Sequence, residues 1–188
     1  MRDLPDAARG KSYLGYSDAG FLLAAFDKAG LSVAHGPMVQ DVLRAGGEAA
    51  ITCALDWLVR REPGSLEQGL VAGKRSMAFN LTVLSNLLGT ALEPDFAGAD
   101  LLIEEVAEHE YRLDRMMFHL TGSASVRRCR SIRMGRMSEI PVNHPLFGSD
   151  AESIVRDWCA RSGIAFGGGA DVGHDARNRI VPFDLARD

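Results

Sequence analysis

The sequence predicts an α/β fold in which a parallel sheet with a serine at a sharp turn is followed by a smaller α/β domain. Two strand-helix units open the chain. A strand at residues 12–16 precedes apolar residues at helical spacing, and a strand at 31–34 precedes a long helix over 39–61, which Gly46 and Gly47 weaken. Successive strand-helix units are typical of a parallel sheet.

The second half of the chain begins after a stretch that resembles a linker, RREPGSLEQGLVAGK at residues 60–74. The elements expected after it are a helix at 80–88, a strand at 101–105, a helix at 110–120, an extended segment at 126–137, a helix at 150–161 and a strand at 180–183. We therefore expect a first domain at residues 1–62, a linker at 63–75 and a second domain at 76–188.

Composition limits the possible partners. The 188 residues are 46% hydrophobic and 24% charged, and 21 Lys+Arg against 25 Asp+Glu give a net charge of -4. This balance does not favour nucleic acid or anionic lipid, so we expect a small molecule or a protein as partner.

No apolar run is long enough to span a bilayer, which predicts a cytoplasmic chain. Cys53, Cys129 and Cys159 form no CxxC pair, so reduced thiols are expected rather than disulfides or a zinc site.

Ser17 lies where an apolar strand meets a helix, in the segment Gly15-Tyr16-Ser17-Asp18-Ala19. A nucleophile elbow needs small residues two positions before and two after the serine, because the tight turn brings these positions against neighbouring backbone. The amide of Asp18 would then face the oxyanion of a tetrahedral intermediate. The alternative is that Ser17 and Asp18 only cap the helix.

A serine nucleophile needs a histidine base and an acid that orients it. His174 follows the glycine-rich residues 167–173, where few side chains obstruct its approach to another part of the chain. A plain surface histidine is the alternative. Glu104 and Glu105 end an apolar strand and must point to opposite faces, so only one of them can face a site. The residue pattern leaves this choice open, and both could be solvated.

Taken together, these segments resemble the LD-carboxypeptidase family, which also includes the microcin-C immunity peptidases. The Gly-aromatic-Ser-Asp turn at 15–18 and the His-Gly-Pro motif beginning at His35 look like family motifs. Four further segments follow in the family's order, at residues 80–90, 102–105, 111–116 and 171–174. The resemblance covers nearly the whole chain.

The resemblance implies Ser17 as nucleophile, His174 as general base and then acid, Glu104 as orienting carboxylate and the Asp18 amide in the oxyanion hole. It implies a serine carboxypeptidase that removes terminal D-alanine from a murein tetrapeptide in cell-wall recycling. No metal or organic cofactor is implied, and a homodimer is expected.

Two arginines, Arg112 and Arg115, are candidates to bind the free carboxylate of the product. Because arginines on an exposed helix face are usually solvated, this assignment depends on their lying beside Glu104.

The chain departs from the family in several places. The family has an upstream half of its N-terminal domain, with a glycine-rich turn that contributes to the oxyanion hole, and nothing before Lys11 corresponds to it. We therefore expect the remnant of a parallel-sheet N-terminal domain followed by the C-terminal domain. Ala19-Gly20 replaces a bulky residue and threonine, Ala78-Phe79 replaces Gly-Gly, and the chain stops soon after residues 182–184.

Three other interpretations follow from these features. The chain could be a truncated, inactive remnant, or a ligand-binding or scaffolding paralogue. A metal site built on Glu104, Glu105, Glu108 and His109 is not expected, because no HExxH motif supports it. The arginines between residues 127 and 136 fall on both faces of a strand, which favours a solvated strand over a nucleic-acid patch.

Overall fold

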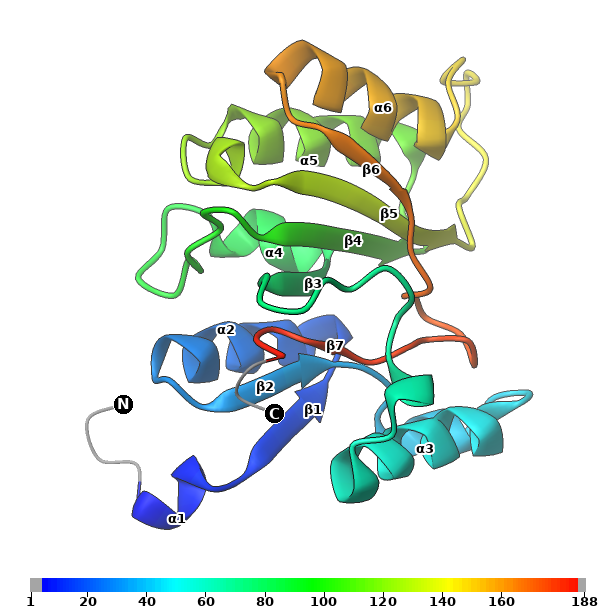
Figure 1. Cartoon of the computed structure of the whole chain (residues 1–188). Helices are drawn as coiled ribbons and strands as arrows, with labels where there is room; N and C mark the ends of the chain where they lie inside the picture. Colours follow the sequence, from blue (N-terminus) through cyan, green and yellow to red (C-terminus); the bar gives the residue numbers. More distant parts are fainter. Residues whose placement is uncertain (1–4, 186–188) are drawn as a thin grey trace.

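A computed structural model describes residues 5–185 and shows the α/β fold that the sequence predicts (Figure 1). The first sheet pairs β1 (Ser12–Gly15) with β2 (Ser32–His35) in parallel, and β2 with β7 (Val181–Pro182) in antiparallel orientation. The short α1 (Asp6–Arg9) precedes β1, and α2 (Gly20–Lys28) connects β1 to β2. The predicted first strand-helix-strand unit is therefore confirmed.

The second sheet is parallel throughout, in the order β3-β4-β5-β6. Its strands are β3 (Ser76–Asn80), β4 (Asp100–Val106), β5 (Ser131–Ser138) and β6 (Phe166–Gly169). Helices α4 (Leu81–Leu87), α5 (Glu110–Gly122) and α6 (Ala151–Ser162) pack on one face of it, and α5 lies against α6 (Figure 1). Because parallel strands end at one edge, the side chains that follow β3, β4 and β5 gather there.

The two sheets share one hydrophobic core. Leu23 of α2 and Val33 of β2 belong to the same buried cluster as Phe79 of β3 and Ile103 of β4, and Phe183, after β7, completes it. The return of the chain at β7 thus joins its C-terminal end to the first sheet (Figure 1). The division at residues 62 and 75 stays a prediction, and its outer limits, residues 1 and 188, lie outside the described residues.

The prediction of a long helix over residues 39–61 is wrong. The segment contains a 3₁₀ turn η2 (Val39–Leu43), then α3 (Gly47–Leu55) and a π-helical turn η3 (Asp56–Arg60). Gly46 has φ 76°, and a Cβ on Gly47 would lie 1.9 Å from the carbonyl oxygen of Asp41. The two glycines break the helix because they allow a left-handed turn and a close backbone approach.

Strands β3 and β6 were not predicted, and the extended segment expected at 126–137 is a strand only from Ser131. A 3₁₀ turn η5 (Val126–Arg128) occupies its beginning. β6 contains three glycines, so no side-chain pattern identifies it, and its pairing with β5 makes it a strand. Among the described residues, no helix combines the length and the apolar character needed to cross a membrane.

Candidate active site

Ser17 occupies a strained turn at the carboxyl end of β1. Its φ is 54°, in the left-handed region that few residues other than glycine adopt. The turn continues into the 3₁₀ segment η1 (Ser17–Ala19) and then α2. A Cβ on Gly15 would lie 2.8 Å from the Cβ of Ala19, so the turn requires a glycine before the serine and tolerates only a small residue after it. This is the local geometry expected of a nucleophile elbow.

His174 and Glu104 form a buried pair. The Nδ1 of His174 lies 2.6 Å from Oε2 of Glu104, although the two residues are 70 positions apart in sequence. Glu104 comes from the carboxyl end of β4 and is 0% exposed, and the His174 side chain is 8% exposed. When Glu104 is ionised, Nδ1 donates the proton in this bond, and in the neutral imidazole Nε2 is then the acceptor.

Burial raises the pKa of Glu104, and the hydrogen bond and charge of His174 oppose this shift. Oε1 of Glu104 is also buried and has no hydrogen-bond partner among residues 5–185. The histidine is thus the principal polar partner of this carboxylate, as an orienting role requires.

Glu105, the other carboxylate of the pair, has a different role. It points away from His174 and accepts hydrogen bonds from Nδ2 of Asn80 at 2.6 Å and from the amide of Thr82 at 2.8 Å. These bonds hold the start of α4. The alternation of the strand therefore separates one carboxylate that faces the histidine from one that anchors a helix.

An irregular pairing of β4 with β5 makes room for the histidine segment. The register shifts between Ile103 and Glu105, opposite Met134 and Met137, so an extra residue of β5 faces Glu104. A Cβ on Gly135, inside this bulge, would lie 2.6 Å from the carbonyl oxygen of Val172 and 3.0 Å from the Cβ of Glu104. Glycine at position 135 therefore permits the close approach that brings His174 to Glu104.

Tyr16, which precedes the candidate nucleophile, packs between two histidines. Its ring centroid lies 4.9 Å from that of His174 and 5.9 Å from that of His35. Neither ring nitrogen of His35 has a hydrogen-bond partner within the described part of the chain. Burial, with smaller contributions from His174 and Arg136, lowers the pKa of His35 to about 3, so this ring is neutral.

The structure places the predicted site residues as follows. Glu104 and His174 are in contact, and the Ser17 turn meets His174 through the Tyr16 ring. Between residues 5 and 185, no hydrogen bond joins the Ser17 hydroxyl to His174. The side chain of Asp18 is exposed, and its backbone lies at the start of η1.

Arg112 and Arg115 lie on α5 and interact with neighbours on or next to that helix. The Nε of Arg112 is 2.5 Å from Oε2 of Glu108, and the guanidinium of Arg115 lies 5.0 Å from the centre of the Tyr111 ring. Both arginines therefore keep their substrate role only as a prediction.

Two residues of the site were not predicted from the sequence. Asp41 accepts a hydrogen bond from the Tyr16 hydroxyl, and Arg44 donates one from Nη1 to the carbonyl oxygen of His174 at 2.6 Å. Both lie in the segment expected to be a continuous helix. The Gly46-Gly47 pair was the one local signal that the helix ends and frees their side chains for other contacts.

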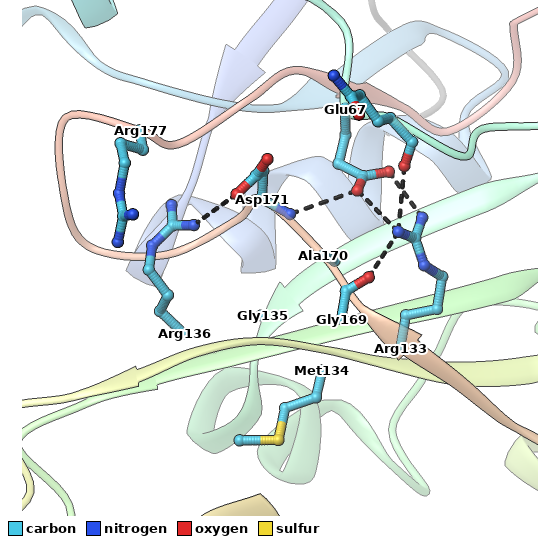
Figure 2. A pocket seen from close by; sticks show the side chains of 10 residues that line it. Glu67, Arg133, Met134, Gly135, Arg136, Gly169, Ala170, Asp171 and Arg177 are labelled. Atoms are coloured by element: carbon cyan, nitrogen blue, oxygen red, sulfur yellow. Dashed lines mark hydrogen bonds and ion pairs between the residues drawn. The ribbon is translucent and has the colours of Figure 1, made fainter.

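An open groove of about 460 Å³ runs along the segment that leads to His174 (Figure 2). At one end Arg133 binds the buried Glu67 through two bonds, of 2.6 and 2.8 Å. At the other end Nη1 of Arg136 lies 3.2 Å from Oδ1 of Asp171. Arg177 also lines the groove, so its lining carries three arginines and two acidic residues, a small excess of positive charge.

Within residues 5–185, no group of three or more His, Cys, Asp and Glu side chains is arranged to hold a metal ion. The arrangement offers a serine on a strained turn whose preceding residue, Tyr16, contacts His174, and Nδ1 of this histidine is held by a buried carboxylate. These are the elements of acid-base and nucleophilic catalysis.

The sequence of this chain is similar to one family model and to several curated proteins. The family model of the LD-carboxypeptidase C-terminal domain matches residues 75–186. The chain is 28% identical over 202 residues to the murein tetrapeptide carboxypeptidase of Pseudomonas aeruginosa, covering 94% of this chain and 62% of the relative. It spans 58% to 62% of the length of the curated relatives it matches.

Solved structures show the same fold. The crystal structure of muramoyltetrapeptide carboxypeptidase from Oxalobacter formigenes superimposes with a TM-score of 0.82 at 26% identity, covering 98% of this chain and 67% of the other. The microcin C7 self-immunity protein MccF shares the fold at 17% identity, with a TM-score of 0.76 over 94% of this chain and 63% of its own. The family model, which matches more than half of the sequence, establishes that this chain belongs to the LD-carboxypeptidase family.

Proposed function

We propose that Ser17, His174 and Glu104 form the triad of a serine carboxypeptidase that releases terminal D-alanine from a murein tetrapeptide. The observation that carries the proposal is the 2.6 Å bond between His174 and the fully buried Glu104. Tyr16, which precedes the serine held at positive φ, packs against the same histidine. The relative from Pseudomonas aeruginosa, named a murein tetrapeptide carboxypeptidase, supports the substrate class.

The reaction begins when Oγ of Ser17 attacks the carbonyl carbon of the bond to D-alanine and its proton passes to Nε2 of His174. The C–N bond of the tetrahedral intermediate then breaks, Nε2 gives its proton to the leaving amine, and D-alanine departs. A water molecule attacks the remaining ester while His174 takes its proton. The ester C–O bond breaks, and Ser17 recovers its hydrogen from His174.

Each residue has a defined task in this scheme. Glu104 keeps the Nδ1 proton in place and stabilises the imidazolium that forms twice in the cycle. The Asp18 amide, at the start of η1, is proposed to donate to the oxyanion. The Ser17 to Nε2 hydrogen bond is expected to form when substrate binds, since such bonds are often long in unliganded enzymes.

The test is D-alanine release from a murein tetrapeptide by the folded chain, with Ser17→Ala as control. The fold of both samples is checked first by circular dichroism. Release that the substitution abolishes supports the proposal. Absence of release from a folded chain would favour the alternative of a truncated, inactive member of the family, or of a ligand-binding or scaffolding paralogue.

A substrate contact is proposed with this function. Arg112 or Arg115 would bind the carboxylate of the peptide, and truncating the arginine that binds it is expected to raise KM more than it lowers kcat.

A location and an oligomeric state are proposed as well. A cytoplasmic location fits the buried Cys129 and Cys159, whose free thiols have pKa values that burial raises to about 11. A homodimer is expected from the family resemblance, and sedimentation velocity would test it.

A further inference from the structure

A buried carboxylate connects the serine turn to the segment that follows β2. Asp41 is 2% exposed and accepts hydrogen bonds from the Tyr16 hydroxyl at 2.6 Å, the Met38 amide at 2.8 Å and Nε of Arg44 at 2.9 Å. Burial and the neighbouring Asp41 raise the pKa of Tyr16, which keeps its hydroxyl a donor. The residue next to Ser17 is therefore fixed to a charged group in η2.

Arg44 extends this connection to the candidate base. While its Nε binds Asp41, its Nη1 donates to the carbonyl oxygen of His174 at 2.6 Å, across 130 residues of sequence. The rigid guanidinium fork spans both acceptors at once, which a lysine ammonium on a flexible stem cannot reproduce. A continuous chain of hydrogen bonds thus runs from Tyr16 through Asp41 and Arg44 to the backbone of His174.

The segment that carries His174 has little regular structure of its own. It lies between β6 and β7. Its backbone is bonded to β5 through the Arg136 amide and the carbonyl oxygen of Val172 at 2.9 Å, and within the segment through the Gly173 amide to Oδ1 of Asn178 at 3.2 Å and the Arg179 amide to the carbonyl oxygen of Asp171 at 2.8 Å. The bond to Glu104 and the contact with the Tyr16 ring both act on the imidazole ring, and neither holds the backbone of His174. A nucleophile and its base must be held within about 0.5 Å of productive geometry.

We propose that Arg44 is a positioning residue that sets the place of His174 relative to the Ser17 turn, through its simultaneous bonds to Asp41 and to the His174 backbone. Its effect on turnover depends on the proposed function, whereas its effect on the order of the His174 segment does not.

The experiment compares Arg44→Met and Arg44→Lys with the unchanged chain. Arg60→Met is the matched control, because Arg60 is an exposed arginine that pairs with Asp56 on its own turn. Amide exchange measured by NMR at Gly173 and Arg179 reports on the segment, and the Ile132 amide, bonded to Ala165, serves as reference. D-alanine release gives kcat and KM.

Loss of a charged hydrogen bond predicts that Arg44→Met exchanges about tenfold or more faster at both amides and loses about 10- to 100-fold in kcat, with KM nearly unchanged. Arg44→Lys is expected to give exchange rates and a kcat between those of Arg44→Met and the unchanged chain. Arg60→Met is expected to match the unchanged chain in every measurement.

Unchanged exchange in folded Arg44→Met overturns the proposal, as does faster exchange with full kcat, or a loss confined to KM. If Arg44→Met does not fold, Arg44→Lys decides by the same criteria. If no sample releases D-alanine but the exchange rates rise as expected, the proposed function fails while the positioning of the segment by Arg44 stands.

Discussion

Replacing Glu104 by glutamine removes one charge and keeps the size of the side chain. In the structure this carboxylate is fully buried, and Oε2 lies 2.6 Å from Nδ1 of His174. In the proposed mechanism His174 becomes an imidazolium, and unit charges about 4 Å apart attract by about 4 kcal/mol at an effective dielectric constant near 20. Losing this attraction in the transition state predicts a fall in kcat of about a thousandfold.

The assay is the initial rate of D-alanine release over a range of tetrapeptide concentrations, with unfolding in urea measured on the same samples. KM is expected to change little, because Glu104 does not contact the substrate in the proposed mechanism.

Glu105→Gln is the matched control, since it makes the same chemical change one residue away. Glu105 binds Asn80 and Thr82 rather than the histidine, so its replacement is expected to cost about 1–3 kcal/mol of stability and less than tenfold in kcat. Folded Glu104→Gln that keeps more than a tenth of kcat, or Glu105→Gln that loses as much kcat as Glu104→Gln, would refute the reasoning.

Three further predictions follow from the site. Gly135→Ala places a Cβ 2.6 Å from Val172 and is expected to cost about 1–3 kcal/mol of stability and most of the activity. Gly122→Ala is the control, since its Cβ would meet nothing within 4 Å beyond its chain neighbours and the backbone of its own helix, and it should cost neither. Urea unfolding and D-alanine release measure both variants, and equal effects would contradict this account. Because His35 has a pKa of about 3 when folded and about 6.5 when unfolded, its contribution to stability is complete above pH 6.5 and falls toward pH 3, by up to about 1.4 kcal/mol per pH unit; His35→Leu should flatten this part of the stability curve, and an unchanged slope would count against it. Prolonged dialysis against a strong chelator should leave D-alanine release unchanged, and a loss that zinc restores would indicate a metal mechanism.

Local patterns identified the parts of the site that depend on local geometry. The glycine and alanine around Ser17 follow from the space available in one turn, and strand alternation limited the acid to Glu104 or Glu105. The resemblance to the family selected Glu104, and the bond to His174 is consistent with that selection. The catalytic roles of these residues stay predictions.

The features that the sequence did not predict depend on contacts between residues far apart in the chain. The functions of Asp41 and Arg44 depend on a helix break at Gly46-Gly47 and on a partner 130 residues away, and neither residue has an unusual neighbourhood in the sequence. Strand β6 has no apolar alternation, because its glycines contribute backbone pairing and little side-chain packing.

The most direct test of the proposed triad is covalent capture of its nucleophile. Folded chain is treated with a fluorophosphonate, which phosphonylates an activated serine hydroxyl and releases fluoride, and the modified peptide is located by mass spectrometry. The account predicts one adduct, on Ser17, that is absent from Ser17→Ala and formed at least a hundredfold more slowly by Glu104→Gln and by His174→Ala. An adduct on another serine, or labelling of Ser17 at the same rate in the His174 variant, would contradict the proposal that His174 activates Ser17.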